Sequence, residues 1–291
     1  MTLDRRAIAL AALCWATTPL LAAGPPAPAA PPDSPPPPNS VAIVEVAATI
    51  TPADIAGAAA TDYMSVPLPG ELLAALSKQC KPNWASEFRA PANTALTNRA
   101  QIALNLGALI ADGYVAVEAQ DGGQVKNIGR DILALGKALG ISNEVIARGS
   151  SIAQFAENNE WTALKEELEA TQNEVKNAME KIRDDDLVTL ISLGGWIRGM
   201  EIVADIIYNN YSPATAALIR QPALCAYLRG KINTLSPKVR EDVLVAALNK
   251  QLEDVQTLVS MPMGTVASKE DIKKLKETVA GMVKLIGTKS N

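Results

Sequence analysis

The chain has 291 residues, of which 48 % are hydrophobic and only 4 % aromatic, and its formal net charge is −4. That length allows one large domain or two small ones, and an aliphatic core suits close helix packing better than a β-sandwich. A mildly acidic chain lacks the lysine and arginine excess that drives nucleic-acid binding, so we expect no nucleic-acid partner.

Histidine is absent from the sequence. Its absence excludes Ser-His-Asp and Cys-His catalysis and every metal site that uses an imidazole ligand. Histidine is also the commonest general base, so any acid–base chemistry would depend on Asp, Glu, Lys or Tyr. We find no catalytic or cofactor-binding motif, and we therefore expect a chain that is not an enzyme and has no resident cofactor or metal.

The first part of the chain has the composition of an export signal. Arg5 and Arg6 precede an apolar stretch, so residues 1–23 are predicted to be a secretory signal peptide. The alternative is a retained N-terminal membrane anchor, although the apolar stretch is short for a span and contains Pro19. A signal peptide predicts that the mature chain lies in the bacterial periplasm or outside the cell.

A proline-rich stretch and an irregular region follow the signal. Residues 24–40 include PPAPAAPPDSPPPP, which holds nine of the 19 prolines. Proline lacks a backbone N–H and fixes φ, so this stretch is predicted to be an extended or disordered linker. Residues 41–91 are predicted to contain irregular chain and short helices at 52–61 and 69–79. VAIVEV at 41–46 is the only short β-branched run, and no partner strand is evident.

From residue 92 to residue 291, apolar residues recur at helical spacing, which predicts an all-α, multi-helix bundle of about eight to ten helices. Two predicted helices, 95–120 and 187–208, are apolar on nearly every side. Such a helix is either buried or spans a membrane, and an ionisable group such as Arg198 would be costly at mid-bilayer. Both are therefore predicted to be central buried helices, and the mature chain is predicted not to be transmembrane.

Further helices are predicted around these two. Their expected bounds are 125–139, 160–183, 214–235 with a kink before Pro222, 238–259 with Val239 and Val243 inward, and 268–286. Another helix is predicted after Ser142, and Gly149, Ser150 and Ser151 weaken or interrupt it. The helix at 160–183 has the clearest apolar stripe, and the acids of 184–186 suit the first turn of the next helix. The last helix carries lysines beside apolar residues. An ordinary surface helix is predicted there, with peripheral membrane contact as the alternative.

The two apolar helices share a local pattern. The first helix contains the pair Leu106-Gly107, and the second contains the pair Leu193-Gly194, 87 residues later. The pattern predicts two pseudo-repeated four-helix units, 95–183 and 186–259, whose glycine-containing helices pack against each other. Chance similarity between apolar helices is the alternative. The same helices also contain Gly113, Gly195 and Gly199. Small residues at such spacing let helix backbones approach closely.

A buried charged residue needs a partner. Arg198 lies among apolar residues, and leaving its guanidinium unpaired would cost several kcal/mol. Glu201 reaches it along the helix, and Asp112 in the other apolar helix is the cross-helix candidate. We therefore predict a buried ionic cluster of Arg198 with Asp112, Glu201 or both. The walls of a cavity beside this cluster would be Tyr114, Trp196 and Tyr208.

Three functions are consistent with these features. The first is an exported, non-catalytic helical scaffold or protein-interaction domain on a proline-rich tether, with an unidentified protein partner. The second is a domain that binds a small apolar molecule or lipid in a cavity beside the central helices. Its candidate binding residues are Asp112, Tyr114, Trp196, Arg198 and Glu201. The third is an enzyme that uses paired carboxylates such as Asp112 and Glu201, although these two fit a structural ion pair better.

Two cysteines, Cys80 and Cys225, remain after removal of the predicted signal, which contains Cys14. An even pair in an oxidising compartment predicts a disulfide. Two buried free thiols are the alternative, because sequence alone does not fix the separation of the two residues.

Overall fold

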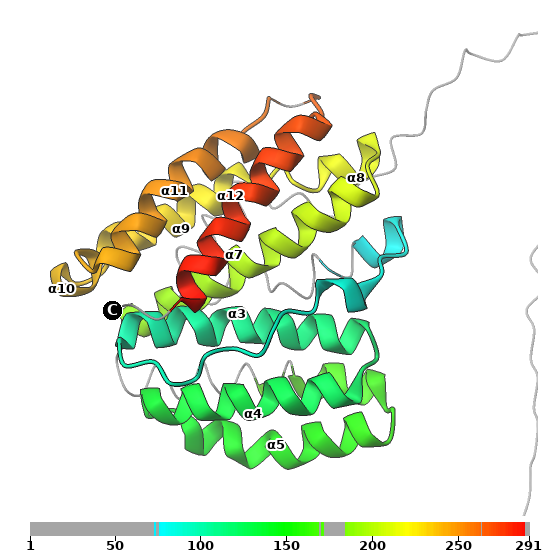
Figure 1. Ribbon diagram of the computed structural model, residues 1–291, viewed down its shortest axis with the longest axis vertical. Coiled ribbons are helices and arrows are strands. Elements are labelled where there is room, and N and C mark those ends of the chain that lie inside the picture. Colours follow the sequence, from blue (N-terminus) through cyan, green and yellow to red (C-terminus); the bar gives the residue numbers. More distant parts are fainter. Residues whose placement is uncertain (1–72, 74–75, 169, 172–183, 263, 289–291) are drawn as a thin grey trace, which may run out of the picture. The chain divides into compact units, whose positions relative to one another are not determined.

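The computed structural model describes residue 73 and residues 76–168, 170–171, 184–262 and 264–288. All of them belong to one compact unit, Glu45–Asn291, and the other unit, Met1–Val44, lies outside the described residues. Every regular element in the described part is a helix, so the all-α, multi-helix prediction is confirmed there (Figure 1). The predicted signal, linker and β-branched run lie outside the described residues. So does the predicted helix at 52–61.

The helices, in chain order, are η1 (Trp84–Glu87), α3 (Arg99–Glu118), α4 (Gly122–Leu139), α5 (Ser142–Glu157), α7 (Asp185–Asn209), α8 (Pro213–Ala217), α9 (Pro222–Thr234), α10 (Pro237–Arg240), α11 (Val243–Val259) and α12 (Lys269–Gly287). η1 is a 3-10 helix and the others are α-helices. Residues 161–168 and 170–171 are also helical, and the rest of the helix predicted at 160–183 lies outside the described residues.

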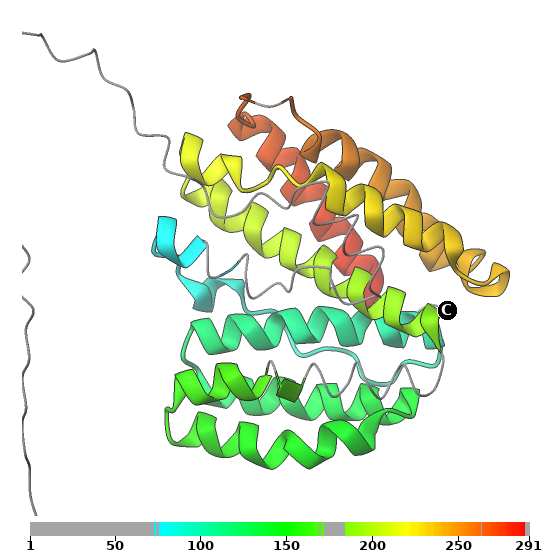
Figure 2. The same ribbon diagram turned by 180° about the vertical axis from the view of Figure 1, so that it is seen from behind.

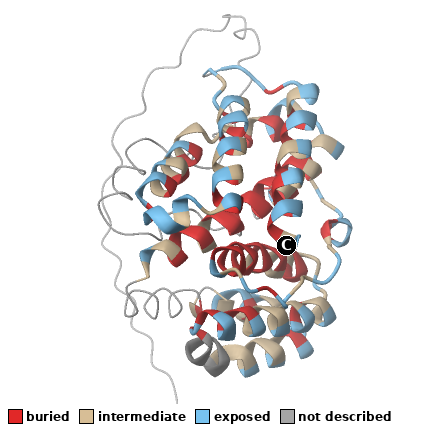
Figure 3. Ribbon diagram, turned by 60° about the vertical axis from the view of Figure 1, so that its left-hand side comes forward, coloured by how far each residue is buried: buried red, intermediate tan, exposed pale blue. Residues whose placement is uncertain are grey.

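The helices α3 and α7 form the centre of the bundle and share its most extensive helix–helix interface. Both are long and apolar enough to cross a membrane, but 83 % and 78 % of their most apolar stretches are buried by the rest of the protein. Figure 3 shows this burial concentrated where the helices pack inside the bundle. Packing against other helices accounts for the all-round apolar character. The prediction of two central buried helices is confirmed.

Glycines allow the backbones of α3 and α7 to touch where the helices cross. A Cβ atom at Gly107 would lie 1.9 Å from the carbonyl oxygen of Ile191, and one at Gly194 would lie 2.0 Å from that of Leu104. At Gly195 it would lie 3.3 Å from the carbonyl oxygen of Gly107. The predicted packing of the two glycine-containing helices is thus confirmed, whereas the division into two repeats stays a prediction.

The remaining helices cover this pair on two sides. α4 packs against α3 and α5 against α4, while α12 packs against both α7 and α11, and α11 against α9 (Figures 1 and 2). At the end of α12, the buried amides of Gln101 and Asn105 donate to the Ile286 carbonyl oxygen at 3.0 and 2.6 Å. These α3 side chains therefore satisfy a terminal carbonyl that has no partner within α12. The apolar face of α12 is buried, as expected for an ordinary surface helix.

Capping residues move several predicted boundaries. α3 begins at Arg99, later than predicted, because the Asn98 side chain caps it by accepting from the Gln101 N–H at 3.0 Å. Asp121 lies between the helices predicted at 95–120 and 125–139 and is the N-cap of α4, since its carboxylate accepts from the Gln124 N–H at 2.9 Å. α4 ends at Leu139, as predicted, and Gly140 follows it with a φ of 85°.

Three further helix predictions need correction. α5 continues to Glu157 without interruption at its Gly-Ser-Ser sequence. The helix predicted at 214–235 is two helices, α8 and α9, since Pro222 begins a new helix instead of kinking one. The helix predicted at 238–259 also divides, because Asp242 caps α11 through the Leu244 N–H at 2.9 Å. Val243 is consequently 86 % exposed at the start of α11, not inward.

Cys80 and Cys225 are free thiols, which corrects the predicted disulfide. The Cys225 thiol is buried in the core, 3.9 Å from the Leu252 carbonyl oxygen, and the Cys80 thiol donates to the Leu76 carbonyl oxygen at 3.4 Å. Burial raises the pKa of Cys80, and it raises the pKa of Cys225 to about 12 despite the nearby Arg229. An even cysteine count predicted pairing, but it carries no information on where each thiol packs.

Candidate functional site

Arg198 occupies the centre of a buried ionic cluster between α3 and α7. Its side chain is only 3 % exposed. Nε donates to Asp112 Oδ1 at 2.8 Å, and Nη1 donates to Glu201 Oε2 at 2.7 Å. Nη2 donates to the backbone carbonyl oxygen of Glu87. The predicted cluster is confirmed, and it contains both candidate acids.

The charge on Arg198 is compensated within the protein. Burial opposes the charged form, but the Asp112 and Glu201 carboxylates outweigh this effect and raise the pKa of the guanidinium above its ordinary value. Each of the three guanidinium nitrogens donates to a protein oxygen. The group is therefore charged, paired and hydrogen-bonded, which are the conditions under which a buried charge is tolerated.

A second arginine in the cluster was missed at the sequence level. Arg89 Nε donates to both carboxylate oxygens of Asp112, at 3.0 and 3.3 Å, and its Nη2 also pairs with the same group. Arg89 lies in irregular chain after η1, where no helical periodicity indicates which way a side chain points. Helical spacing in the sequence therefore could not predict the contact between Arg89 and α3.

Glu87 was missed for the same reason, and it lies beside Asp205 of α7. The residue is 7 % exposed. Burial, together with the Asp205 charge and hydrogen bond, raises the pKa of Glu87 to about 8, against the opposing effects of Arg198 and Ser86. Asp205 in turn forms an ion pair with Lys276 of α12. The cluster thus links η1, α3, α7 and α12.

The aromatic residues predicted to wall a cavity are placed differently. Trp196 is buried in the core, and Tyr114 is half-buried against it. The ring of Tyr208 lies under two lysine ammonium groups, 4.8 Å from Lys269 Nζ and 5.2 Å from Lys276 Nζ. These rings therefore pack against the core or bind cations of α12.

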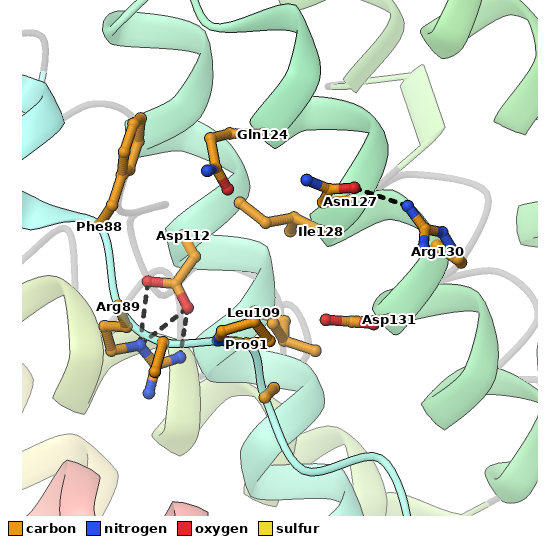
Figure 4. A pocket seen from close by; sticks show the side chains of 12 residues that line it. Phe88, Arg89, Pro91, Leu109, Asp112, Gln124, Asn127, Ile128, Arg130 and Asp131 are labelled. Atoms are coloured by element: carbon orange, nitrogen blue, oxygen red, sulfur yellow. Dashed lines mark hydrogen bonds and ion pairs between the residues drawn. The ribbon is translucent and has the colours of Figure 1, made fainter.

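A cleft of about 290 Å³ opens next to Asp112, between the chain at 88–92, α3 and α4 (Figure 4). Its lining residues are Phe88, Arg89, Ala90, Pro91, Ala92, Leu109, Asp112, Gln124, Asn127, Ile128, Arg130 and Asp131. Of the five candidate binding residues from the sequence, only Asp112 lines it. Figure 4 shows the Asp112 carboxylate turned toward Arg89, with Asp131 and the Asn127–Arg130 pair on α4.

The cleft offers balanced charges and limited space. Arg89 and Arg130 are matched in charge by Asp112 and Asp131, and the apolar part of the lining includes Ile128. Its volume is at the lower end of ligand pockets, which start at about 300 Å³. A small polar or zwitterionic molecule fits these features better than a lipid chain. Among the described residues, no group of three or more Cys, Asp or Glu side chains is arranged to hold a metal ion.

Comparison with known proteins finds no match for this chain among protein-family models, curated proteins or solved structures. The geometry described above therefore carries the functional argument without support from a relative.

Proposed function

We propose that this chain is an exported, non-catalytic helical scaffold or protein-interaction domain carried on a proline-rich tether. The observation that supports this proposal best is that all three guanidinium nitrogens of Arg198 donate to protein oxygens. The charged centre of the bundle therefore joins helices, and the buried guanidinium directs each of its nitrogens at a protein oxygen.

The acids of the cluster support the same proposal. Asp112 accepts from both Arg89 and Arg198, and Glu201 accepts from Arg198. Both acids are therefore engaged in ion pairs with arginine inside the protein. Asp112 and Glu201 are thus better suited to structural pairing than to glycoside cleavage. Export and tethering are inferred from residues 1–40.

Native mass spectrometry of the gently purified protein tests the proposal. We expect the mass of a chain that lacks the predicted signal, residues 1–23, and that carries no stoichiometric small molecule. Chemical cross-linking in the envelope or medium should then yield a specific protein adduct. A full-length cytoplasmic chain would contradict export, and turnover of a substrate that is lost in an Asp112→Asn variant would contradict the non-catalytic role.

The cleft beside Asp112 supports a second candidate function, the binding of a small polar molecule. Its mixed apolar and charged lining resembles that of a binding site more closely than that of a packing defect. Ile128→Trp should fill the cleft without touching Arg198. If a bound molecule of low mass appears in the native spectrum and disappears in this variant, the second candidate replaces the first.

A further inference from the structure

Four charged side chains line the cleft beside Asp112, and only two of them pair with each other. Arg89 Nε donates to both carboxylate oxygens of Asp112, at 3.0 and 3.3 Å. The Arg130 guanidinium donates to the neutral amide of Asn127 at 2.6 Å, and the Asp131 carboxylate forms no hydrogen bond or ion pair with any residue that the structure describes. The lining therefore contains one cation and one anion that no opposite charge of the protein matches.

Arg130 and Asp131 do not pair with each other, although they are neighbours in the sequence. Adjacent residues of an α-helix point in different directions, so their side chains do not face each other. Figure 4 shows both at one end of the cleft, with the Arg130 guanidinium turned toward Asn127. A molecule that carries an ammonium and a carboxylate close together can reach both side chains, whereas a molecule with a single charge matches only one of them.

The apolar part of the lining lies next to these two charges. Ile128 precedes Asp131 by three residues and therefore lies on the same face of α4, and Leu109 of α3 and Phe88 add to the apolar surface. An ammonium at Asp131 would thus place a short apolar group against Ile128. The volume of about 290 Å³ is at the lower end of the range for ligand pockets, which favours a molecule of the size of a single amino acid over a peptide.

We propose that this cleft binds a free α-amino acid with an apolar side chain, whose ammonium pairs with Asp131 and whose carboxylate pairs with Arg130. The inference rests on the second candidate function, the binding of a small polar molecule, and it names the class of that molecule. Charge-assisted hydrogen bonds at the two ends of the zwitterion fix its orientation, and burial of its side chain against Ile128 adds affinity.

Saturation-transfer NMR on the purified full chain tests the inference, with L-alanine, L-valine, L-leucine and L-phenylalanine as probes. The probes are added because so small a ligand makes few contacts and dissociates during purification. At least one should bind saturably to the wild type, and this binding should be lost in Ile128→Trp, in which the cleft is filled. Saturable binding of none of the four, or equal binding to Ile128→Trp, would overturn the inference. If none binds but the native spectrum shows a small molecule that Ile128→Trp lacks, the amino-acid class is wrong and the second candidate function remains.

Two derivatives of the bound amino acid test the two pairings separately. Its amide lacks the negative charge and its deaminated acid lacks the positive charge, so each should bind the wild type at least about tenfold more weakly than the free amino acid. In Arg130→Gln the amide should bind as tightly as the free amino acid, and in Asp131→Asn the deaminated acid should do so. Asp254→Asn, which removes an exposed acid of α11 outside the cleft, should keep the selectivity of the wild type. Undiminished selectivity in Arg130→Gln or in Asp131→Asn would refute the proposed pairing.

Discussion

The helices α3 and α7 meet in two different ways along their length. Around Gly107 and Gly194 their backbones touch, and no side chain lies between them. Around Asp112 and Arg198 they are joined by long charged side chains that donate and accept hydrogen bonds. The first contact requires glycines, which have no side chain, and the second requires paired charges. A larger side chain at the crossing should therefore strain the two backbones. A substitution in the cluster should instead leave a charged side chain without its partner, and replacing that side chain as well should recover part of the lost stability.

The largest expected effect comes from adding one methyl group at the crossing. Gly107→Ala places a carbon 1.9 Å from the Ile191 carbonyl oxygen, which neither helix can avoid without moving its backbone. We expect a loss of about 3 kcal/mol or more in the free energy of unfolding, measured by urea denaturation.

Gly129→Ala is the matched control, because nothing lies within 4 Å of a Cβ atom there. It should stabilise α4 by up to about 1 kcal/mol through helix propensity alone. If both alanine variants have the stability of the wild type, the helices do not cross at the glycines.

The next largest effect is expected at the cluster. Arg198→Met leaves the Asp112 and Glu201 carboxylates without their shared partner, and we expect a cost on the order of 3 kcal/mol in the free energy of unfolding. Thermal and urea denaturation both measure it. An unchanged melting temperature would show that Arg198 is solvated and not buried.

A smaller effect is expected for the more exposed acid of the cluster. Glu201→Gln keeps an oxygen that accepts from Arg198, and the Asp112 carboxylate still balances the guanidinium. We expect a loss of about 1 kcal/mol in the free energy of unfolding. A loss as large as that of Arg198→Met would mean that Glu201, and not the cross-helix acid, is the main partner.

The smallest effect is expected on the surface. Lys126 and Glu157 join α4 and α5 at 2.6 Å, but their side chains are 42 % and 59 % exposed. Glu157→Gln should change the free energy of unfolding by less than about 0.5 kcal/mol, since solvent screens such pairs. A cost near that of Arg198→Met would remove the distinction between buried and exposed pairs.

The periodicity of apolar residues predicted the central helices and the contacts of residues that lie on them. The all-round apolar pattern of α7 indicated burial, and burial required a partner for Arg198, which is how Asp112 was found on the other apolar helix. The same method missed Glu87 and Arg89, because they lie in a short 3-10 helix and irregular chain where side-chain direction has no period. It also missed the break before α11, since Asp242 caps a new helix where the apolar pattern alone predicted a continuous one.

A double-mutant cycle on Arg198 and Asp112 tests the central claim most directly, namely that this buried pair joins two helices. The free energy of unfolding would be measured for the wild type, Arg198→Met, Asp112→Leu and the double variant. We expect the double variant to be more stable than the sum of the single losses allows, by at least about 1 kcal/mol, because the pairing of Arg198 with Asp112 is lost in both single variants and is counted only once in the double variant. Losses that add to within about 0.5 kcal/mol would show that the two residues do not stabilise each other, and would contradict the account.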